Sequence, residues 1–132
     1  MANEAAWIET PTEFMRYTVT DGTAIPLGTL MQLSADNTAL ASSANSEVWA
    51  GVAWEEKTIS DGITQLTCAV NGVADLTCGG DGVTLGALVS LSGANIIKDA
   101  IAAEILSGDV IGKALETGSE AEVIRVRLGR ST

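Results

Sequence analysis

The sequence contains no histidine, only two cysteines and two prolines, and an aromatic content of 4%. Without histidine, the Ser-His and Cys-His arrangements of nucleophilic catalysis cannot form. A four-ligand zinc site would also lack soft donors, because Cys68 and Cys78 stand alone and not in a C-x-x-C spacing. We expect both cysteines to be buried free thiols, and we expect no metal and no cofactor.

Basic residues are scarce as well. Seven Lys and Arg stand against seventeen Asp and Glu, which gives a formal net charge of −10. A protein that grips nucleic acid or an anionic membrane surface needs a basic face, so neither partner is expected. No apolar run approaches the ~20 residues that cross a bilayer, and the start has no signal-peptide pattern.

Candidate catalytic groups are equally few. Glu55 and Glu56 are neighbours, and neighbours on a strand point to opposite faces, so they cannot act as the facing carboxylates of a glycosidase. The segment 108–114 is similar to a phosphate-binding loop, but it is one residue short and lacks the Ser or Thr that would hold magnesium. The sequence therefore predicts a protein that is not an enzyme.

The chain does contain an internal repeat. Each copy has a Leu-Gly-x-Leu element followed by an Asn, then a Gly-x-Ala element that ends in Glu, then an alternating run. The matching segments are 27–34 with 85–92, 51–55 with 112–116, and 66–70 with 124–128. At 132 residues we expect one β domain over 21–132, with repeat copies covering about 21–70 and 81–128.

The repeat is built from short β elements. Turn signals such as Asp-Gly and Asn-Gly recur every eight to twelve residues, a spacing typical of an all-β sandwich or barrel. Val123–Leu128 alternates strictly, which predicts one buried and one exposed face. Only 99–106 favours a turn or two of helix, ended by Gly108, and its counterpart 40–45 is expected to be a loop with at most one turn.

Residues 1–20 differ from the rest, with no glycine and with the only Phe and Tyr of the chain. Pro11 disfavours a continuous helix, so we expect an extended N-terminal arm that ends in a strand around 14–20. Residues 12–20 fit equally well as the first strand of the core sheet, whereas 1–11 favour the arm because chain ends stay loose unless they are held.

Two features leave alternatives open. Asn71-Gly72 fits either a two-residue hairpin or a bulge in one long strand over 65–77, and we prefer the long strand because it links the two copies without a reversal. Trp49 and Trp54 are five residues apart and face opposite sides of a regular strand, so at most one is expected fully in the core. The other is a candidate interface anchor or carbohydrate-stacking surface.

Several segments of the chain resemble a known family. The segments 81–89 and 108–116, together with Val123–Leu128 and the preceding 70–76, are similar to the capsid cement, or head decoration, proteins of tailed bacteriophages and related viruses. The resemblance covers roughly residues 18–129 and rests on patterns of small and apolar residues. It implies a compact β-barrel or β-tulip-like domain with no catalytic residues, made in the host cytoplasm and placed on the outer surface of the virion capsid.

The same resemblance implies the partners. Such proteins commonly form homotrimers and clamp subunits of the major capsid protein, and an apolar arm with a basic strand face suits that role. The alternative is a small carbohydrate-binding β module that uses Trp49 or Trp54. The candidate residues for the capsid or subunit interface are Trp7, Ile8, Phe14, Met15, Tyr17, Trp49, Arg125, Arg127 and Arg130.

Overall fold

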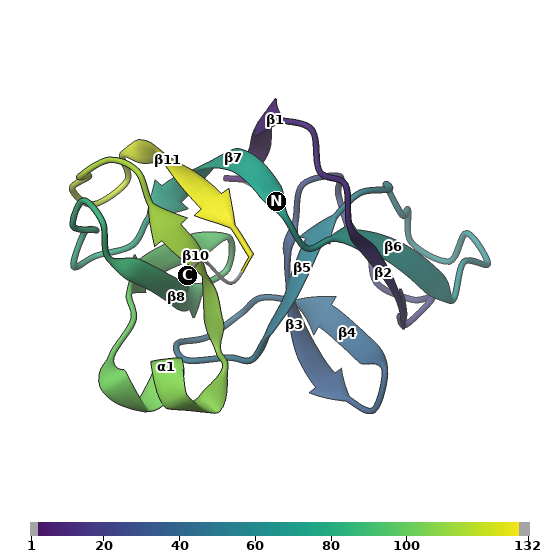
Figure 1. Ribbon diagram of the computed structural model, residues 1–132. Helices are drawn as coiled ribbons and strands as arrows, with labels where there is room; N and C mark the ends of the chain where they lie inside the picture. The colour runs from purple at the N-terminus through teal and green to yellow at the C-terminus, as the bar shows by residue number, and fades with distance from the viewer. Residues whose placement is uncertain (1–2, 130–132) are drawn as a thin grey trace.

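The computed structural model describes residues 3–129, and this part of the chain is almost entirely β structure. Eleven strands and one short helix run through it (Figure 1). In chain order they are β1 (Ala6–Glu9), β2 (Phe14–Thr18), β3 (Leu30–Ala35), β4 (Thr38–Ala41), β5 (Trp49–Ala53), β6 (Gln65–Ala69), β7 (Gly72–Cys78), β8 (Leu88–Gly93), β9 (Ile96–Asp99), α1 (Ala102–Ser107), β10 (Val110–Ala114) and β11 (Val123–Leu128). The predicted mainly β class is confirmed.

The first copy of the repeat closes into a barrel of its own. Its strand order is β2-β4-β3-β5-β6, with β2 antiparallel to β6 and closed against β4 by the parallel pair Thr18↔Thr38. Small and medium apolar side chains fill its core, as the scarcity of aromatic residues requires. They are Val19, Ile25, Met31, Ala39, Ala50, Ala53, Leu66 and Cys68.

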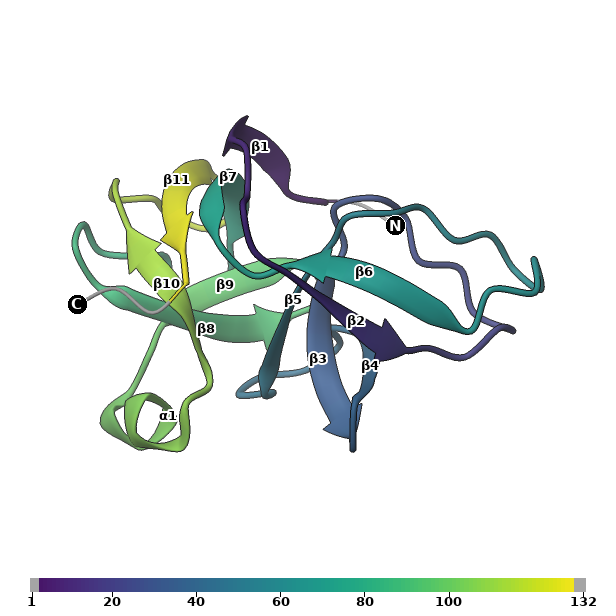
Figure 2. The same cartoon turned by 45° about the vertical axis from the view of Figure 1, so that its right-hand side comes forward.

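The second copy closes into another barrel with the same plan. Its order is β7-β11-β10-β8-β9, closed by a parallel pairing of β7 with β9, and β1 is added outside β7. Even the registers agree, because Met31↔Ala41 in the first hairpin corresponds to Val89↔Asp99 in the second. The repeat therefore encodes two barrels of equal topology, which lie side by side in Figures 1 and 2.

Local predictions in the second copy hold. β11 alternates as expected, with Ile124, Val126 and Leu128 buried and the residues between them exposed. Helix α1 covers Ala102–Ser107 and ends at Gly108, whose φ of 80° is the left-handed conformation that glycine adopts easily. In the first copy, β4 extends to Ala41, so part of the segment expected to be a loop is strand.

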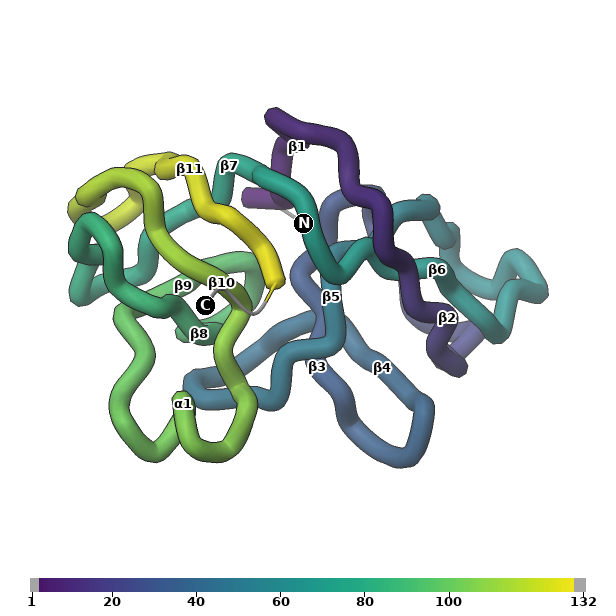
Figure 3. The backbone as a smooth tube through the Cα atoms, viewed as in Figure 1, coloured from purple at the N-terminus to yellow at the C-terminus, as the bar shows by residue number. Residues whose placement is uncertain are grey.

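The link between the copies is neither a hairpin nor one continuous strand. β6 belongs to the first barrel and β7 to the second, and the chain passes between them at Val70 and Asn71 (Figure 3). The hairpin alternative is wrong because β6 and β7 do not pair with each other. The expected passage from one copy to the other without a reversal agrees with this path.

The N-terminal segment is extended, but it lies on the body of its own chain, which corrects the view of it as a loose arm. β1 pairs antiparallel with β7, and the amide of Ala5 donates to the carbonyl of Gly28 at 2.8 Å. A Cβ on Gly28 would stand 2.7 Å from the Ala5 carbonyl oxygen, so the close approach requires glycine. β2 is a full strand of the first barrel, as the core-sheet alternative for 12–20 had it.

Both barrels begin before the predicted repeat copies, 21–70 and 81–128, because β2 precedes the first range and β7 precedes the second. The prediction of a single cooperative domain over 21–132 stays a prediction that unfolding experiments can test. Within residues 3–129, no helix is long and apolar enough to cross a membrane.

Candidate interaction surface

The two barrels meet along one face of the first. Leu30 of β3 and Val52 of β5 belong to the buried cluster of the second barrel, while their neighbours Met31 and Ala53 point into the first. Trp49, half-buried, packs against the same cluster. This outer face of β3 and β5 is thus apolar because the second barrel covers it, and we call the contact the joint.

A buried asparagine fixes the joint. Asn95, at the tip of the β8–β9 hairpin, is fully buried and accepts a hydrogen bond from the amide of Leu30 at 2.8 Å. The backbone amide of Asn95 donates a hydrogen bond to the Ser42 hydroxyl at 2.9 Å. Asn95 has a φ of 59°, a conformation that Asn tolerates better than most side chains. Buried polar groups are costly unless they are bonded, so these contacts specify how the barrels dock.

A buried carboxylate of α1 supports the same joint. Glu104 accepts hydrogen bonds from Ser46 of the first barrel, from Ser90 and from the Ile101 amide, and pairs with Lys98 at 2.9 Å. The loop that carries Ser46 reaches across to α1 in Figure 1. Burial by itself raises the pKa of Glu104, but the hydrogen bonds from Ser46, Ile101, Lys98 and Ser90 outweigh it and lower the pKa to about 2.

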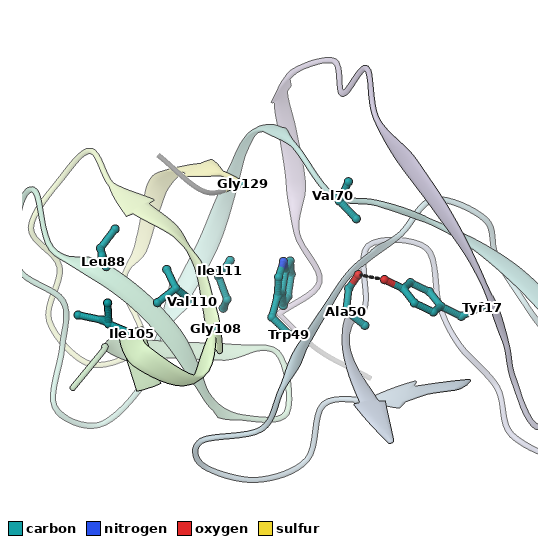
Figure 4. Close-up of a pocket in the computed structure, with 10 residues that line it drawn as sticks. All are labelled: Tyr17, Trp49, Ala50, Val70, Leu88, Ile105, Gly108, Val110, Ile111 and Gly129. Atoms are coloured by element: carbon teal, nitrogen blue, oxygen red, sulfur yellow. Dashed lines mark hydrogen bonds between the residues drawn. The ribbon is translucent and has the colours of Figure 1, made fainter. Parts of the chain in front are cut away.

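A groove opens beside the joint, with a volume of about 430 Å³ (Figure 4). Trp49 and Tyr17 come from the first barrel, and the opposite wall belongs to the second. The Tyr17 hydroxyl already donates to the carbonyl of Ala50 at 2.8 Å, and burial raises its pKa. The full lining is Tyr17, Trp49, Ala50, Val70, Leu88, Ile105, Gly108, Val110, Ile111 and Gly129. Apart from the Tyr17 hydroxyl and the Trp49 indole nitrogen, these side chains are apolar.

Helix α1 extends the apolar surface beyond the groove. Leu106 is 88% exposed, Ile101 57% and Ile105 38%, and Ile105 also lines the groove. Apolar side chains exposed singly are ordinary, but several on one short helix beside an apolar groove form a patch. This patch was not predicted, although the apolar residues of 99–106 exceed what one buried helix face needs.

Two aromatic residues of the N-terminal segment, Trp7 and Phe14, lie against Trp54. The Trp54 ring centroid lies 5.6 Å from that of Trp7 and 5.3 Å from that of Phe14, in edge-on and tilted arrangements. Trp7 also packs against the second barrel. The side-chain oxygen of Asn71 holds the segment in place by accepting hydrogen bonds from the backbone amides of Thr12 and Glu13. The predicted anchors Ile8, Phe14 and Met15 nevertheless stay 41%, 41% and 50% exposed.

The basic strand face lies elsewhere. Arg125 and Arg127 are exposed on β11, and Lys113 of β10 stands opposite Arg127 in the register. Arg125 comes within 3.9 Å of Asp75 on β7. Arg130 lies outside the described residues. Of the described candidate residues, Trp7 and Phe14 lie around Trp54, Tyr17 and Trp49 line the groove, Arg125 and Arg127 lie on β11, and Ile8 and Met15 are exposed on β1 and β2.

A second buried charge lies in the first barrel, where sequence analysis missed it. The Lys57 ammonium is fully buried and donates to Asp21 at 3.0 Å and Asp61 at 2.9 Å. Burial lowers the pKa of Lys57, but the bonds to Asp61 and Asp21 outweigh it and raise the pKa, while that of Asp61 falls to about 2. The expected free thiols are confirmed for Cys68 and Cys78, and burial raises the pKa of Cys68 to about 12.

Comparison with known proteins gives one informative result. No family model and no curated protein matches the chain. Among solved structures, it is similar to the N base of head fiber gp8.5 of bacteriophage phi29, with a TM-score of 0.57 and 16% sequence identity. The match covers 91% of this chain and 98% of that chain. The two share a fold over nearly their whole lengths.

Proposed function

We propose that this protein is a structural, non-catalytic component of the head of a tailed phage. It binds the outer surface of the assembled capsid as a homotrimer and stabilises contacts between subunits of the major capsid protein. The observation that carries the proposal is the shared fold with a phage head fiber base along almost the entire chain. The resemblance of residues 18–129 to head decoration proteins, seen in the sequence alone, supports the same role.

The surface suits such a role. Ile8, Phe14 and Met15 are exposed apolar side chains of β1 and β2, and Arg125 and Arg127 present positive charge on β11. In a chain of net charge −10, the basic strand face is the part best suited to meet acidic groups across a joint. Its attraction depends on salt, because exposed charges are screened beyond about 10 Å at 0.1 M ionic strength.

The test uses phage heads that lack the protein. Purified protein is added to such heads, bound copies are counted after sedimentation, and the temperature of DNA release is measured. We expect saturable binding and a higher release temperature. Arg125→Glu with Arg127→Glu should weaken binding about tenfold at low salt and less at high salt.

Arg16→Glu is the matched control, because Arg16 is exposed on β2, away from β11. It changes the net charge by −2, as Arg125→Glu and Arg127→Glu each do singly, and it should bind nearly as the wild type does. Absence of binding to heads, or binding that leaves DNA release unchanged, would contradict the proposed function.

Carbohydrate binding is the second candidate, and the observation that favours it is Trp49 in the wall of the groove. Sugars need several hydrogen-bonding partners, and this groove offers few polar side-chain groups, of which the Tyr17 hydroxyl is already bonded. Trp54 has its ring against Trp7 and Phe14. Titration of tryptophan fluorescence with glycans separates this candidate from the first.

A further inference from the structure

One repeat docks on the other through a hairpin that lies on a barrel face. An equivalent hairpin and an equivalent face are both at least partly exposed elsewhere in the molecule. Within the chain, the β8–β9 hairpin of the second barrel lies on the outer face of the first barrel at Leu30, and Asn95 at its tip is buried there. The chain therefore contains one hairpin seated on one barrel face.

The equivalent hairpin of the first barrel, β3–β4, does not dock on the second barrel. The β3–β4 hairpin has the register of β8–β9, yet its tip residues Ser34 to Asn37 are exposed. Leu33 and Leu40 on its strands are 37% and 40% exposed, whereas Leu91, which corresponds to Leu33, is fully buried. Figures 1 and 2 show the far end of this hairpin projecting from the first barrel, away from the second.

The equivalent face of the second barrel, on β8 and β10, is also only partly covered. By register, Leu88 and Val110 of the second barrel occupy the places of Leu30 and Trp49 in the first. Leu30 is fully buried, whereas its counterpart Leu88 is only half-buried. Trp49 and Val110 are both half-buried, and Leu88 and Val110 line the groove. The apolar residues of α1 stand at its edge. The groove is thus the second barrel's version of the face that receives a hairpin in the first.

Charge distinguishes the second contact from the first. At the hairpin tip, Ala94 of the second copy is replaced by Asp36 in the first. On the receiving face, Val52 of the first barrel is replaced by Lys113, which is exposed and pairs in register with Leu88. Asp36 on the hairpin tip and Lys113 on the receiving face carry opposite charges, which would attract each other across a contact between chains.

We propose that the groove at Leu88 and Val110 receives the β3–β4 hairpin of a second copy of this chain. The contact is head-to-tail, because hairpin and groove are different surfaces, and head-to-tail contacts form rings when the rotation between subunits closes. The proposal rests on the self-association included in the proposed function, and it does not depend on capsid binding.

Sedimentation velocity of the full chain over a concentration series tests the contact. Asp36→Lys and Lys113→Asp should each weaken self-association about tenfold or more, and the double variant should regain most of it, because opposite charges face each other again. Leu88→Asp should abolish association. Leu85→Asp is the control, since Leu85 is 63% exposed on the same barrel but does not line the groove.

Each outcome decides the proposal. Self-association that none of these variants changes would overturn the hairpin contact while leaving the homotrimer intact, and a chain that is monomeric at every concentration would overturn both. If Asp36→Lys reduced binding to heads without changing self-association, the hairpin would contact the capsid and the inference would be wrong. Circular dichroism of each variant reports folding, and the charge-swap pair keeps the test decisive if Leu88→Asp does not fold.

Discussion

The two barrels have the same strand order and register, but their hairpin tips have opposite environments. Asn37 and Asn95 occupy equivalent positions with φ values of 51° and 59°. Asn37 is exposed, whereas Asn95 is buried and bonded to the other barrel. The comparison teaches that the duplicated pattern specifies the barrel, while contacts outside each barrel give equivalent residues different energetic roles.

The two barrels also differ in the buried charge that each contains. The first barrel buries a cation, Lys57, between Asp21 and Asp61, and the second buries an anion, Glu104, beside Lys98. Lys57 holds two turns of its own barrel, and Glu104 reaches Ser46 of the other. The place of Lys57 is taken by Gly118 in the second barrel, since the bridge Ile25↔Lys57 matches Val83↔Gly118. A Cβ there would lie 2.7 Å from the Cys78 sulfur.

The largest difference should appear between equivalent leucines. Leu91→Ala should reduce the free energy of unfolding by about 3 kcal/mol, because it empties a fully buried site. Leu33→Ala should reduce it by less than about 1 kcal/mol, because Leu33 is partly exposed. Urea unfolding followed by circular dichroism measures both values.

Tryptophan fluorescence in the same experiment reports on the joint and on the N-terminal segment, since Trp49 and Trp7 pack against the second barrel and the Trp7 ring contacts Trp54. Transitions that coincide with those from circular dichroism would support the single-domain prediction, and separate transitions would refute it. Equal losses from Leu91→Ala and Leu33→Ala would show that the barrels do not differ as described.

The asparagine pair should give an intermediate difference. Asn95→Ala should lower the free energy of unfolding by about 2 kcal/mol more than Asn37→Ala, because it leaves the buried amide of Leu30 without its partner. Both substitutions place alanine at positive φ, so that strain cancels in the comparison. Thermal unfolding of the two variants gives the difference, and equal melting temperatures would contradict it.

The smallest effect concerns pH. The pKa of Glu104 is lowered to about 2 in the fold, so its contribution is fully present above its ordinary value of 4.5 and is lost as pH falls toward 2. Glu104→Gln should reduce stability by about 1 kcal/mol at neutral pH and flatten its decline in acid. Asp61→Asn is the control for the first barrel, where the pKa of Asp61 is also about 2. A stability curve in acid that Glu104→Gln leaves unchanged would refute the role of Glu104.

Much of the fold was predictable because strands and turns leave local signals. The strict alternation of Val123–Leu128, the turn residues and the repeated Leu-Gly and Gly-x-Ala elements correctly predicted a β-barrel protein. Repeated Glu55 and Glu116 even make the same bond, each accepting the amide of a residue on the next strand. The separate closure of each copy was not predicted, since pairing of β7 with β9 or β2 with β4 leaves no trace in either segment alone.

The candidate surface was harder to predict for the same reason. Trp49 and Tyr17 were predicted as interface residues, and the structure brings both to the groove. Leu88, Val110 and the exposed residues of α1 were not predicted, because the pattern of an apolar residue in a repeat is the same whether or not a neighbour covers it. The N-terminal segment was assigned to an arm because its pairing partner lies more than sixty residues along the chain.

By itself, the sequence determined that this chain makes short strands twice over, with apolar cores, free thiols and none of the histidine-dependent chemistry of enzymes. Those properties depend on composition and on spacing within a few residues. Only the tertiary structure decided that the copies close separately, that Asn95 is buried while Asn37 is exposed, and that Leu88 faces a groove. These outcomes depend on which barrel faces which, and long-range packing sets that arrangement after local patterns have been satisfied.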